Sequence, residues 1–183
     1  MLRKFVLLLS LAAVSLAGCN AHTASLSGPK QKETAPAAGE IGSRLPDFSV
    51  KDLQGGREIS SADLRGKVVL IDFWATWCQP CKKEMPGYQK LLDRYGPQGF
   101  VVIGFKFDTM QDAEDPIRFA RKIGVHYPLA VASDDLNLKF GGIQGLPTTM
   151  LYDRQGILRT RIIGFEYTDT VEKALILALN ESQ

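Results

Sequence analysis

Histidine and cysteine are scarce in this chain of 183 residues, which has two His and three Cys. A structural zinc site needs four Cys or His ligands, usually arranged as two pairs. Cys78 and Cys81 supply one pair. His22 and His126 each stand alone in the sequence, so a second pair is missing. The scarcity therefore argues against a metal site, and His126 is interpreted as a structural or surface residue.

An excess of one charge is also lacking, because 22 Lys and Arg face 20 Asp and Glu. A chain this close to neutrality has no electrostatic footprint for nucleic acid or for an anionic membrane surface. Its composition, 45% hydrophobic and 23% charged, is that of an ordinary globular protein. We therefore expect one domain with a core of its own.

Long apolar runs are missing from all of the chain except its start. Arg3 and Lys4 precede an almost wholly apolar run at residues 5–17, which ends in small residues before Cys19. This order is typical of a secretory signal peptide, and the run is shorter than the roughly 18 residues that a spanning helix needs. We predict that residues 1–18 are a signal peptide.

The sequence Leu-Ala-Gly-Cys at residues 16–19 resembles the lipobox of bacterial lipoproteins, in which the Cys becomes the lipidated N-terminus. Cys19 is therefore predicted to carry lipid; the alternative is ordinary cleavage, which would leave a free thiol. Residues 20–40 are rich in Ala, Ser, Thr, Pro and Gly and show no apolar period. Such a composition indicates a flexible tether, so residues 19–40 are interpreted as lipidated Cys and tether and residues 41–183 as the domain.

From residue 41 onward the pattern alternates between strands and helices. We expect strands at residues 48–53 and 57–59, forming a hairpin, and at 68–75, 100–107, 129–132, 148–152 and 157–165. Helices are expected at residues 61–64, 78–95, 116–123, 134–140 and 170–180, the last with Asp169 and Glu172 at capping-box spacing. This order predicts an α/β fold: a central mixed sheet flanked by helices, with an N-terminal β-hairpin extension and an inserted strand and helix.

The cysteine pair lies in WATWCQPCKKEMP, residues 74–86, between the apolar strand and the helix that follows it. At a helix start, unpaired backbone N–H groups and the helix dipole favour a thiolate over a thiol, which makes Cys78 a nucleophile. Cys81 lies one turn later on the same face, where it can attack a mixed disulfide on Cys78. A redox-active dithiol is therefore favoured over two buried, inert thiols.

The WCxxC motif after an apolar strand, with Leu146-Pro147-Thr148 about 65 residues later, resembles the thioredoxin fold. The stretch LPDFSVKDLQGGREISSADLRGKVVLIDFWATWCQPCKKEMP is similar to the TlpA/ResA branch of exported, membrane-tethered thiol-disulfide oxidoreductases. The resemblance covers residues 45–179. It implies that Pro147 is a cis-proline facing the cysteines and that Trp77, Leu146, Pro147 and Thr148 bind the substrate.

By the same resemblance Cys78 is the attacking thiol and Cys81 the resolving thiol. Two carboxyl groups flank the pair. Asp72 lies inside the apolar strand, where burial raises a carboxyl pKa and suits it to exchange a proton with Cys81. It matches the buried Asp of thioredoxin but departs from the TlpA/ResA branch, in which this position is often Asn. Glu84 matches the acidic residue of CxxCKKE in ResA-like proteins.

Either carboxyl group could be the main proton carrier. Our hypothesis is that Asp72 serves Cys81 while Glu84 tunes access and polarity. The plain alternatives are an exposed Asp72 at a sheet edge and a solvated Glu84 in the first helical turn. Trp74 is expected either to border the site or simply to pack in the core.

The resemblance implies a lipid-anchored, extracytoplasmic enzyme that reduces protein disulfides without a cofactor or metal. Its implied partners are disulfide-containing proteins, with apocytochrome c as one candidate, and a membrane electron donor of the DsbD/CcdA kind. Asn20 rather than Asp follows Cys19, which in enteric-type bacteria does not mark inner-membrane retention, so the membrane is left open.

Three rival functions remain. A net disulfide oxidase or isomerase would use the same cysteines. A peroxiredoxin-like peroxidase would need a PxxxTxxC context, which this sequence lacks. A non-enzymatic binding lipoprotein would have no use for an intact WCxxC motif.

Overall fold

A computed structural model of the chain describes residues 35–107 and 114–181. The predicted signal peptide, Cys19 and most of the predicted tether lie outside these residues. The last residues of the tether are described, and they include a turn in which Glu40 and Ser43 donate their N–H groups to Ala37 and Glu40. Among the described residues, no helix has the length and apolar character needed to cross a membrane.

A mixed sheet of five strands forms the centre of the fold, in the order β5-β4-β3-β6-β7. The strands are β3 (Val68–Trp74), β4 (Phe100–Lys106), β5 (Leu129–Val131), β6 (Thr148–Tyr152) and β7 (Leu158–Ile163). The pairs β3/β4 and β4/β5 are parallel, whereas β6 runs antiparallel to both β3 and β7. Every residue of β3 is buried, which fits its nearly continuous apolar sequence.

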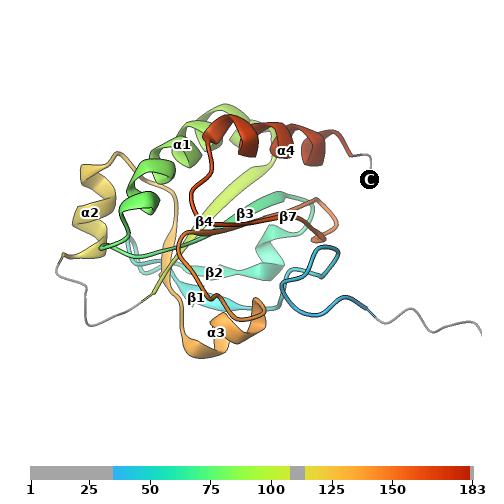
Figure 1. The fold of residues 1–183 in the computed structure, drawn as a ribbon, viewed down its shortest axis with the longest axis horizontal. Helices are drawn as coiled ribbons and strands as arrows, with labels where there is room; N and C mark the ends of the chain where they lie inside the picture. Colours follow the sequence, from blue (N-terminus) through green and yellow to red (C-terminus); the bar gives the residue numbers. More distant parts are fainter. Residues whose placement is uncertain (1–34, 108–113, 182–183) are drawn as a thin grey trace, which may run out of the picture. The chain divides into compact units, whose positions relative to one another are not determined.

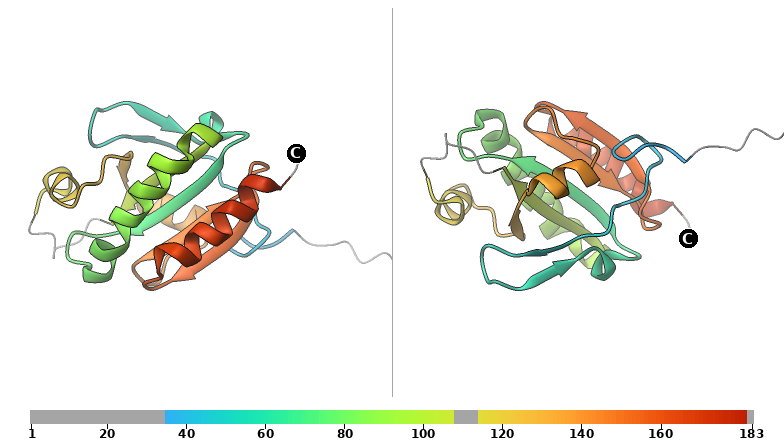
Figure 2. Two further views of the ribbon diagram at one scale, coloured as in Figure 1. Left: turned by 90° about the horizontal axis from the view of Figure 1, so that it is seen from above. Right: turned by 90° about the horizontal axis from the view of Figure 1, so that it is seen from below.

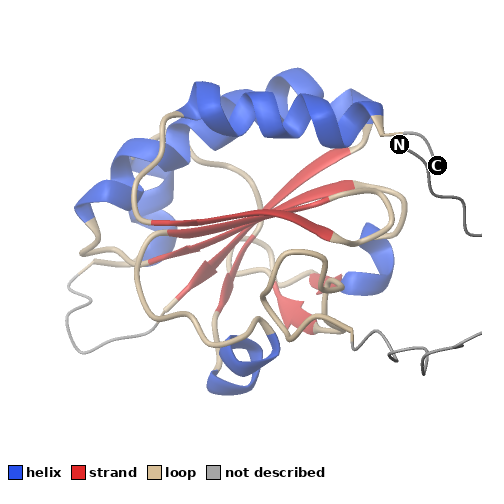
Figure 3. Cartoon of the chain, turned by 45° about the vertical axis from the view of Figure 1, so that its right-hand side comes forward, coloured by secondary structure: helices blue, strands red, loops and turns tan. Residues whose placement is uncertain are grey.

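Helices cover one face of this sheet, and a helix and a hairpin cover the other. The long helices α1 (Gln79–Tyr95) and α4 (Thr168–Asn180) lie side by side on the first face (Figures 1 and 2). The helix α3 (Asp134–Lys139) and the hairpin of β1 (Ser49–Lys51) and β2 (Glu58–Ser60) lie on the opposite face (Figure 3). The remaining elements are α2 (Pro116–Lys122) and the 3-10 helices η1 (Ser61–Leu64) and η2 (Gly96–Gln98).

Alternate residues of β3 contribute their side chains to two hydrophobic cores, one on each face of the sheet. Val69, Ile71 and Phe73 pack on the face covered by α3 and the hairpin. Val68, Leu70 and Trp74 pack under α1 and α4, in the core that also holds both cysteines. Side chains of a strand alternate between faces, so Asp72 belongs to the second face and lies under the helices that carry the site.

Both outer strands of the sheet are covered by other parts of the chain. Along β7, Gly42 donates its N–H to the Leu158 carbonyl and Leu158 donates its own to Ser43. Along β5, Leu53 donates its N–H to the Leu129 carbonyl at 2.7 Å. The hairpin extension and the segment before it therefore pair with part of each outer strand.

The sheet, the flanking helices and the hairpin confirm the predicted fold class. One local prediction is wrong, because α4 begins at Thr168, two residues before the expected start, and Tyr167 caps it without a side-chain hydrogen bond. Glu172 does not take part in a capping box. It accepts hydrogen bonds from Arg94 and Tyr95 of α1, so the packing of the two helices determines its position.

Candidate active site

Cys78 and Cys81 form a disulfide at the start of α1. The strand β3 ends at Trp74, and four residues later Cys78 is the N-cap of the helix, where its sulfur accepts the N–H of Cys81 at 3.3 Å. Pro80 fits the first helical turn because backbone N–H groups there have no partner inside the helix. The local sequence thus places one sulfur at a helix N-terminus, as predicted.

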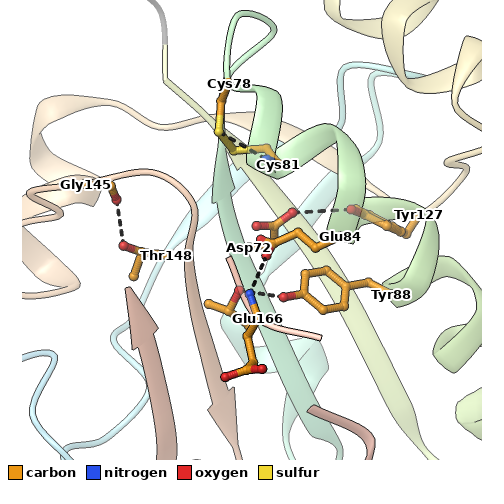
Figure 4. The surroundings of a disulfide bond; sticks show 10 residues. Asp72, Cys78, Cys81, Glu84, Tyr88, Tyr127, Gly145, Thr148 and Glu166 are labelled. Carbon is orange, nitrogen blue, oxygen red and sulfur yellow. Dashed lines mark hydrogen bonds between the residues drawn. A yellow bond between two sulfur atoms is a disulfide. The ribbon is translucent and has the colours of Figure 1, made fainter. Parts of the chain in front are cut away.

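The Pro147 segment directly precedes β6 and is held by two hydrogen bonds. The Leu146–Pro147 peptide bond is cis, which confirms the expected isomer. The Thr148 hydroxyl donates to the Gly145 carbonyl at 2.7 Å (Figure 4). Gly164 donates its N–H to the Pro147 carbonyl at 2.8 Å. Thr148 is buried, so its side chain supports the segment, and its predicted part in substrate binding stays a prediction.

The two tryptophans of the motif have different surroundings. Trp77, next to the disulfide, is 41% exposed, which leaves it accessible to a partner. Trp74 is fully buried and stacks on Phe119 with ring centroids 5.4 Å apart. Trp74 therefore packs in the core, as one of the two expected alternatives stated.

A polar row crosses the centre of the sheet under α1. Asp72 of β3 is paired in register with Gly104 of β4 and with Thr149 of β6. Asp72 is 0% exposed on a central strand, which excludes the exposed sheet-edge alternative. Its Oδ2 accepts the hydroxyl of Tyr127 at 3.4 Å.

Glu84 of α1 lies on the helix face that also carries Cys81 and Tyr88, since these residues are three and four positions away. Glu84 is 1% exposed, so it is not a solvated first-turn residue. Its Oε2 accepts the N–H of Glu166 at 3.5 Å, and the Tyr88 hydroxyl is hydrogen-bonded to that of Thr149 at 2.9 Å (Figure 4). A buried polar cluster of Asp72, Glu84, Tyr88, Tyr127 and Thr149 results.

Burial raises the pKa of both carboxyl groups. It raises the pKa of Asp72 to about 7, although the hydrogen bond from Tyr127 opposes this shift. Burial, with the nearby charge of Asp72 as second cause, raises the pKa of Glu84 to about 9. The two groups titrate as a coupled pair, because the charge of Asp72 opposes the ionisation of Glu84. The pair therefore holds two protons in acid, one near neutrality, and none only in alkali.

One oxygen of each carboxyl group is unsatisfied. Oδ1 of Asp72 and Oε1 of Glu84 are buried and have no hydrogen-bond partner within the described part of the chain. Buried polar atoms are nearly always paired, so exceptions are typical of groups that act in chemistry.

The sequence located the cysteines and both carboxyl groups, but it missed their partners. The neighbours it missed are Tyr88, Tyr127, Thr149 and Gly104. Tyr88 had a detectable signal, because Cys81, Glu84 and Tyr88 follow the helical period. Tyr127 had none, since it reaches Asp72 across 55 positions of sequence through packing alone.

Comparison with known proteins places this site in a family. Residues 41–161 match the AhpC/TSA family. The thiol-disulfide oxidoreductase ResA of Bacillus thuringiensis is 35% identical over 133 residues, which cover 73% of this chain and 75% of that protein. ResA of Geobacillus thermodenitrificans is 34% identical over 142 residues, covering 78% and 80% respectively.

A solved structure gives the same result. The thiol:disulfide interchange protein from Chlorobium tepidum, a thioredoxin-family protein, superposes with a TM-score of 0.68 at 28% identity, over 78% of this chain and 100% of the other. The fold and the disulfide at the start of α1 thus define a thioredoxin-fold thiol-disulfide oxidoreductase. More particularly, the chain belongs to the AhpC/TSA family and, within it, to the ResA-like thiol-disulfide oxidoreductases.

Proposed function

We propose that this protein is a lipid-anchored, extracytoplasmic reductant of protein disulfides that acts through Cys78-Gln79-Pro80-Cys81. One observation carries the proposal: the disulfide lies at the first turn of α1, in the same core as a buried pair of carboxyl groups. A disulfide with only a structural purpose has no need of proton carriers, whereas a dithiol that becomes a disulfide must lose its S–H protons.

Cys78 is the attacking residue. In the reduced protein its thiolate is favoured by the helix N-terminus and by the Cys81 N–H that points at its sulfur. The thiolate attacks one sulfur of the client disulfide, the client S–S bond breaks, and the other client sulfur leaves as a thiolate. Cys78 and the client are then joined by a mixed disulfide.

Cys81 resolves this mixed disulfide. Its S–H proton passes to Asp72, its sulfur attacks that of Cys78, and the second client sulfur leaves as a thiolate, which takes its proton from water. The client gains two electrons and the Cys78–Cys81 disulfide forms. A pKa near neutrality suits Asp72 to this exchange, because the group is then neither fully protonated nor fully ionised. Glu84 keeps a proton at the same pH and tunes the polarity around the pair.

The sequence supports the proposed location, and the family resemblance supports the proposed partners. The signal peptide and lipobox support lipidation of Cys19 and a position outside the cytoplasm, where disulfides form. A reductant there must be reduced in turn, so a membrane electron donor of the DsbD/CcdA kind is the proposed partner. Disulfide-containing proteins, apocytochrome c among them, are the proposed clients, with Trp77, Leu146, Pro147 and Thr148 forming the client side of the site.

Trapping tests this function. Cys81→Ala keeps the attacking thiol but removes the resolving one, so clients are expected to accumulate as mixed disulfides on Cys78 in the native cell envelope. Mass spectrometry of the reduced adducts then identifies them. The matched control is the double variant that also carries Cys78→Ala, which should trap nothing. An envelope in which the single variant traps no more than the double variant would contradict the reductase function.

A further inference from the structure

Tyr127 is a buried residue to which the proposed mechanism assigns no role. Its hydroxyl donates to Oδ2 of Asp72 at 3.4 Å, and its side chain is 1% exposed. Tyr127 comes from the segment before β5, whereas Asp72 lies two strands away on β3. The phenol therefore crosses over β4 to reach the carboxyl group.

Gly104 provides the space for this crossing. It is the β4 residue paired with Asp72, and a Cβ added there would lie 3.2 Å from Cε2 of Tyr127 and 2.9 Å from Nε1 of Trp74. A Cβ contact under 3.0 Å essentially never occurs, and one of 3.2 Å is tighter than most, so glycine leaves both rings the room that a side chain would take. The ring of Tyr127 lies close to the space that a side chain at position 104 of β4 would fill.

The backbone of Tyr127 is fixed from two directions. Oε1 of Gln89, on α1, accepts the N–H groups of His126 and Tyr127 at 2.8 and 3.1 Å. Nε2 of Gln54, in the β1–β2 turn, donates to the Tyr127 carbonyl at 2.9 Å. The phenol is thus held at Asp72 by side chains that serve no catalytic purpose of their own.

We propose that Tyr127 is a positioning residue that fixes the single negative charge of the buried carboxyl pair on Asp72 and leaves the remaining proton on Glu84. The inference deepens the proposed function, on which it rests for the role of Asp72. A hydrogen bond donated to an ionised oxygen is stronger than one donated to a neutral oxygen, so the phenol favours the Asp72 anion. Two carboxyl groups in one buried cluster do not ionise together readily, so charge on Asp72 keeps Glu84 neutral.

Other polar groups near the pair make their contacts with Glu84 or with the backbone. From α1, Tyr88 favours the ionised form of Glu84, not that of Asp72. From the loop after β7, Glu166 offers Glu84 a backbone N–H at 3.5 Å, while its own charge opposes ionisation of Glu84. The cation near the end of β4, Lys106, donates to the Phe107 carbonyl. Tyr127 is the group whose hydroxyl meets Asp72.

The experiment is a pH titration of the disulfide form with 13C-labelled Asp and Glu carboxyl groups, followed by NMR. Tyr127→Phe removes one hydroxyl and is expected to move the Asp72 midpoint to higher pH by about half a unit to one unit. The midpoint of the pH profile for mixed-disulfide resolution should move with it, which lowers the rate about 3- to 10-fold on the acid side.

The matched control is Tyr152→Phe, which also deletes the hydroxyl of a buried tyrosine but on the opposite face of the sheet. It should leave the Asp72 midpoint where it is. Gln89→Ala keeps the phenol and frees the backbone that carries it, so it should move the midpoint in the same direction by less. This variant decides the matter if Tyr127→Phe does not fold.

An Asp72 midpoint that stays unchanged in the folded variants would overturn the proposal, as would an equal shift in Tyr152→Phe. In the Asp72→Asn background, Tyr127→Phe should no longer alter the pH profile of resolution, and a persisting effect would also contradict the inference. The titration concerns the disulfide form by itself. A failure to trap clients would therefore remove the proposed function while leaving the role of Tyr127 to be decided separately.

Discussion

Replacing Asp72 by Asn should stabilise the protein, and the gain should depend on pH. The folded pKa of Asp72, about 7, is higher than its ordinary value of 3.8. Between these values the folded protein holds a proton that the unfolded chain has released, so the free energy of unfolding falls as pH rises from about 4 to about 7. Asn is close to Asp in size and never ionises, so the variant should escape this loss.

The expected gain in the free energy of unfolding follows from the pKa shift of Asp72 and from its burial. A difference of about three pKa units corresponds to about 4 kcal/mol, at about 1.4 kcal/mol per unit. Because Asp72 is 0% exposed, solvent screening does little to reduce this figure. Relaxation around the buried charge reduces it somewhat. We expect Asp72→Asn to raise the free energy of unfolding by about 2 to 4 kcal/mol at pH 8, and to change it by less than about 1 kcal/mol at pH 4.

Urea unfolding of the disulfide form, repeated from pH 4 to pH 9, measures this difference. Asp63→Asn, at an exposed position of η1, is the control and should change stability by less than about 0.5 kcal/mol at every pH. A gain of equal size at all pH values would indicate a packing effect instead of a buried charge. A variant that is less stable at pH 8 than the natural protein would refute the assigned pKa.

Two further predictions concern the same core. Gly104→Ala should destabilise the fold by about 1 to 3 kcal/mol in urea unfolding, because its Cβ would lie 2.6 Å from Cδ2 of Leu129; Gly55→Ala, with open space around it, is the matched control and should not. In a disulfide-reduction assay, Asp72→Asn should remove the pH dependence near neutrality, whereas Glu84→Gln should change the rate but keep that dependence. The assignment of Asp72 is wrong if Glu84→Gln abolishes the dependence and Asp72→Asn leaves it.

Local patterns in the sequence were sufficient for most of the fold. The apolar run of β3 and the helical period of α1 each determine an element and its buried face, and Asp115 with Pro116 marks the start of α2 as expected. The start of α4 was predicted wrongly because its position depends on contacts with α1. The packing of two helices outweighs a capping signal, and Glu172 forms an ion pair with Arg94 instead.

In the site, too, local patterns were sufficient for some residues, whereas packing determined the others. The cysteines and Glu84 lie within seven residues on one helix, so spacing alone brings them together. Asp72 could be predicted as buried, but the order in which it and Glu84 ionise depends on Tyr127. That contact requires a glycine on the intervening strand and a glutamine on α1, and neither requirement leaves a pattern in a single sequence.

The covered edges of the sheet have a consequence for how the protein meets other chains. An open outer strand offers unpaired N–H and C=O groups on which a second chain can add itself, and this is a common start of aggregation. Here the hydrogen bonds of Leu158 and Leu129 to neighbouring segments occupy part of both outer strands. Two copies of this domain that meet side by side would therefore find part of each outer strand already paired, which leaves less strand on which one sheet could extend into the next.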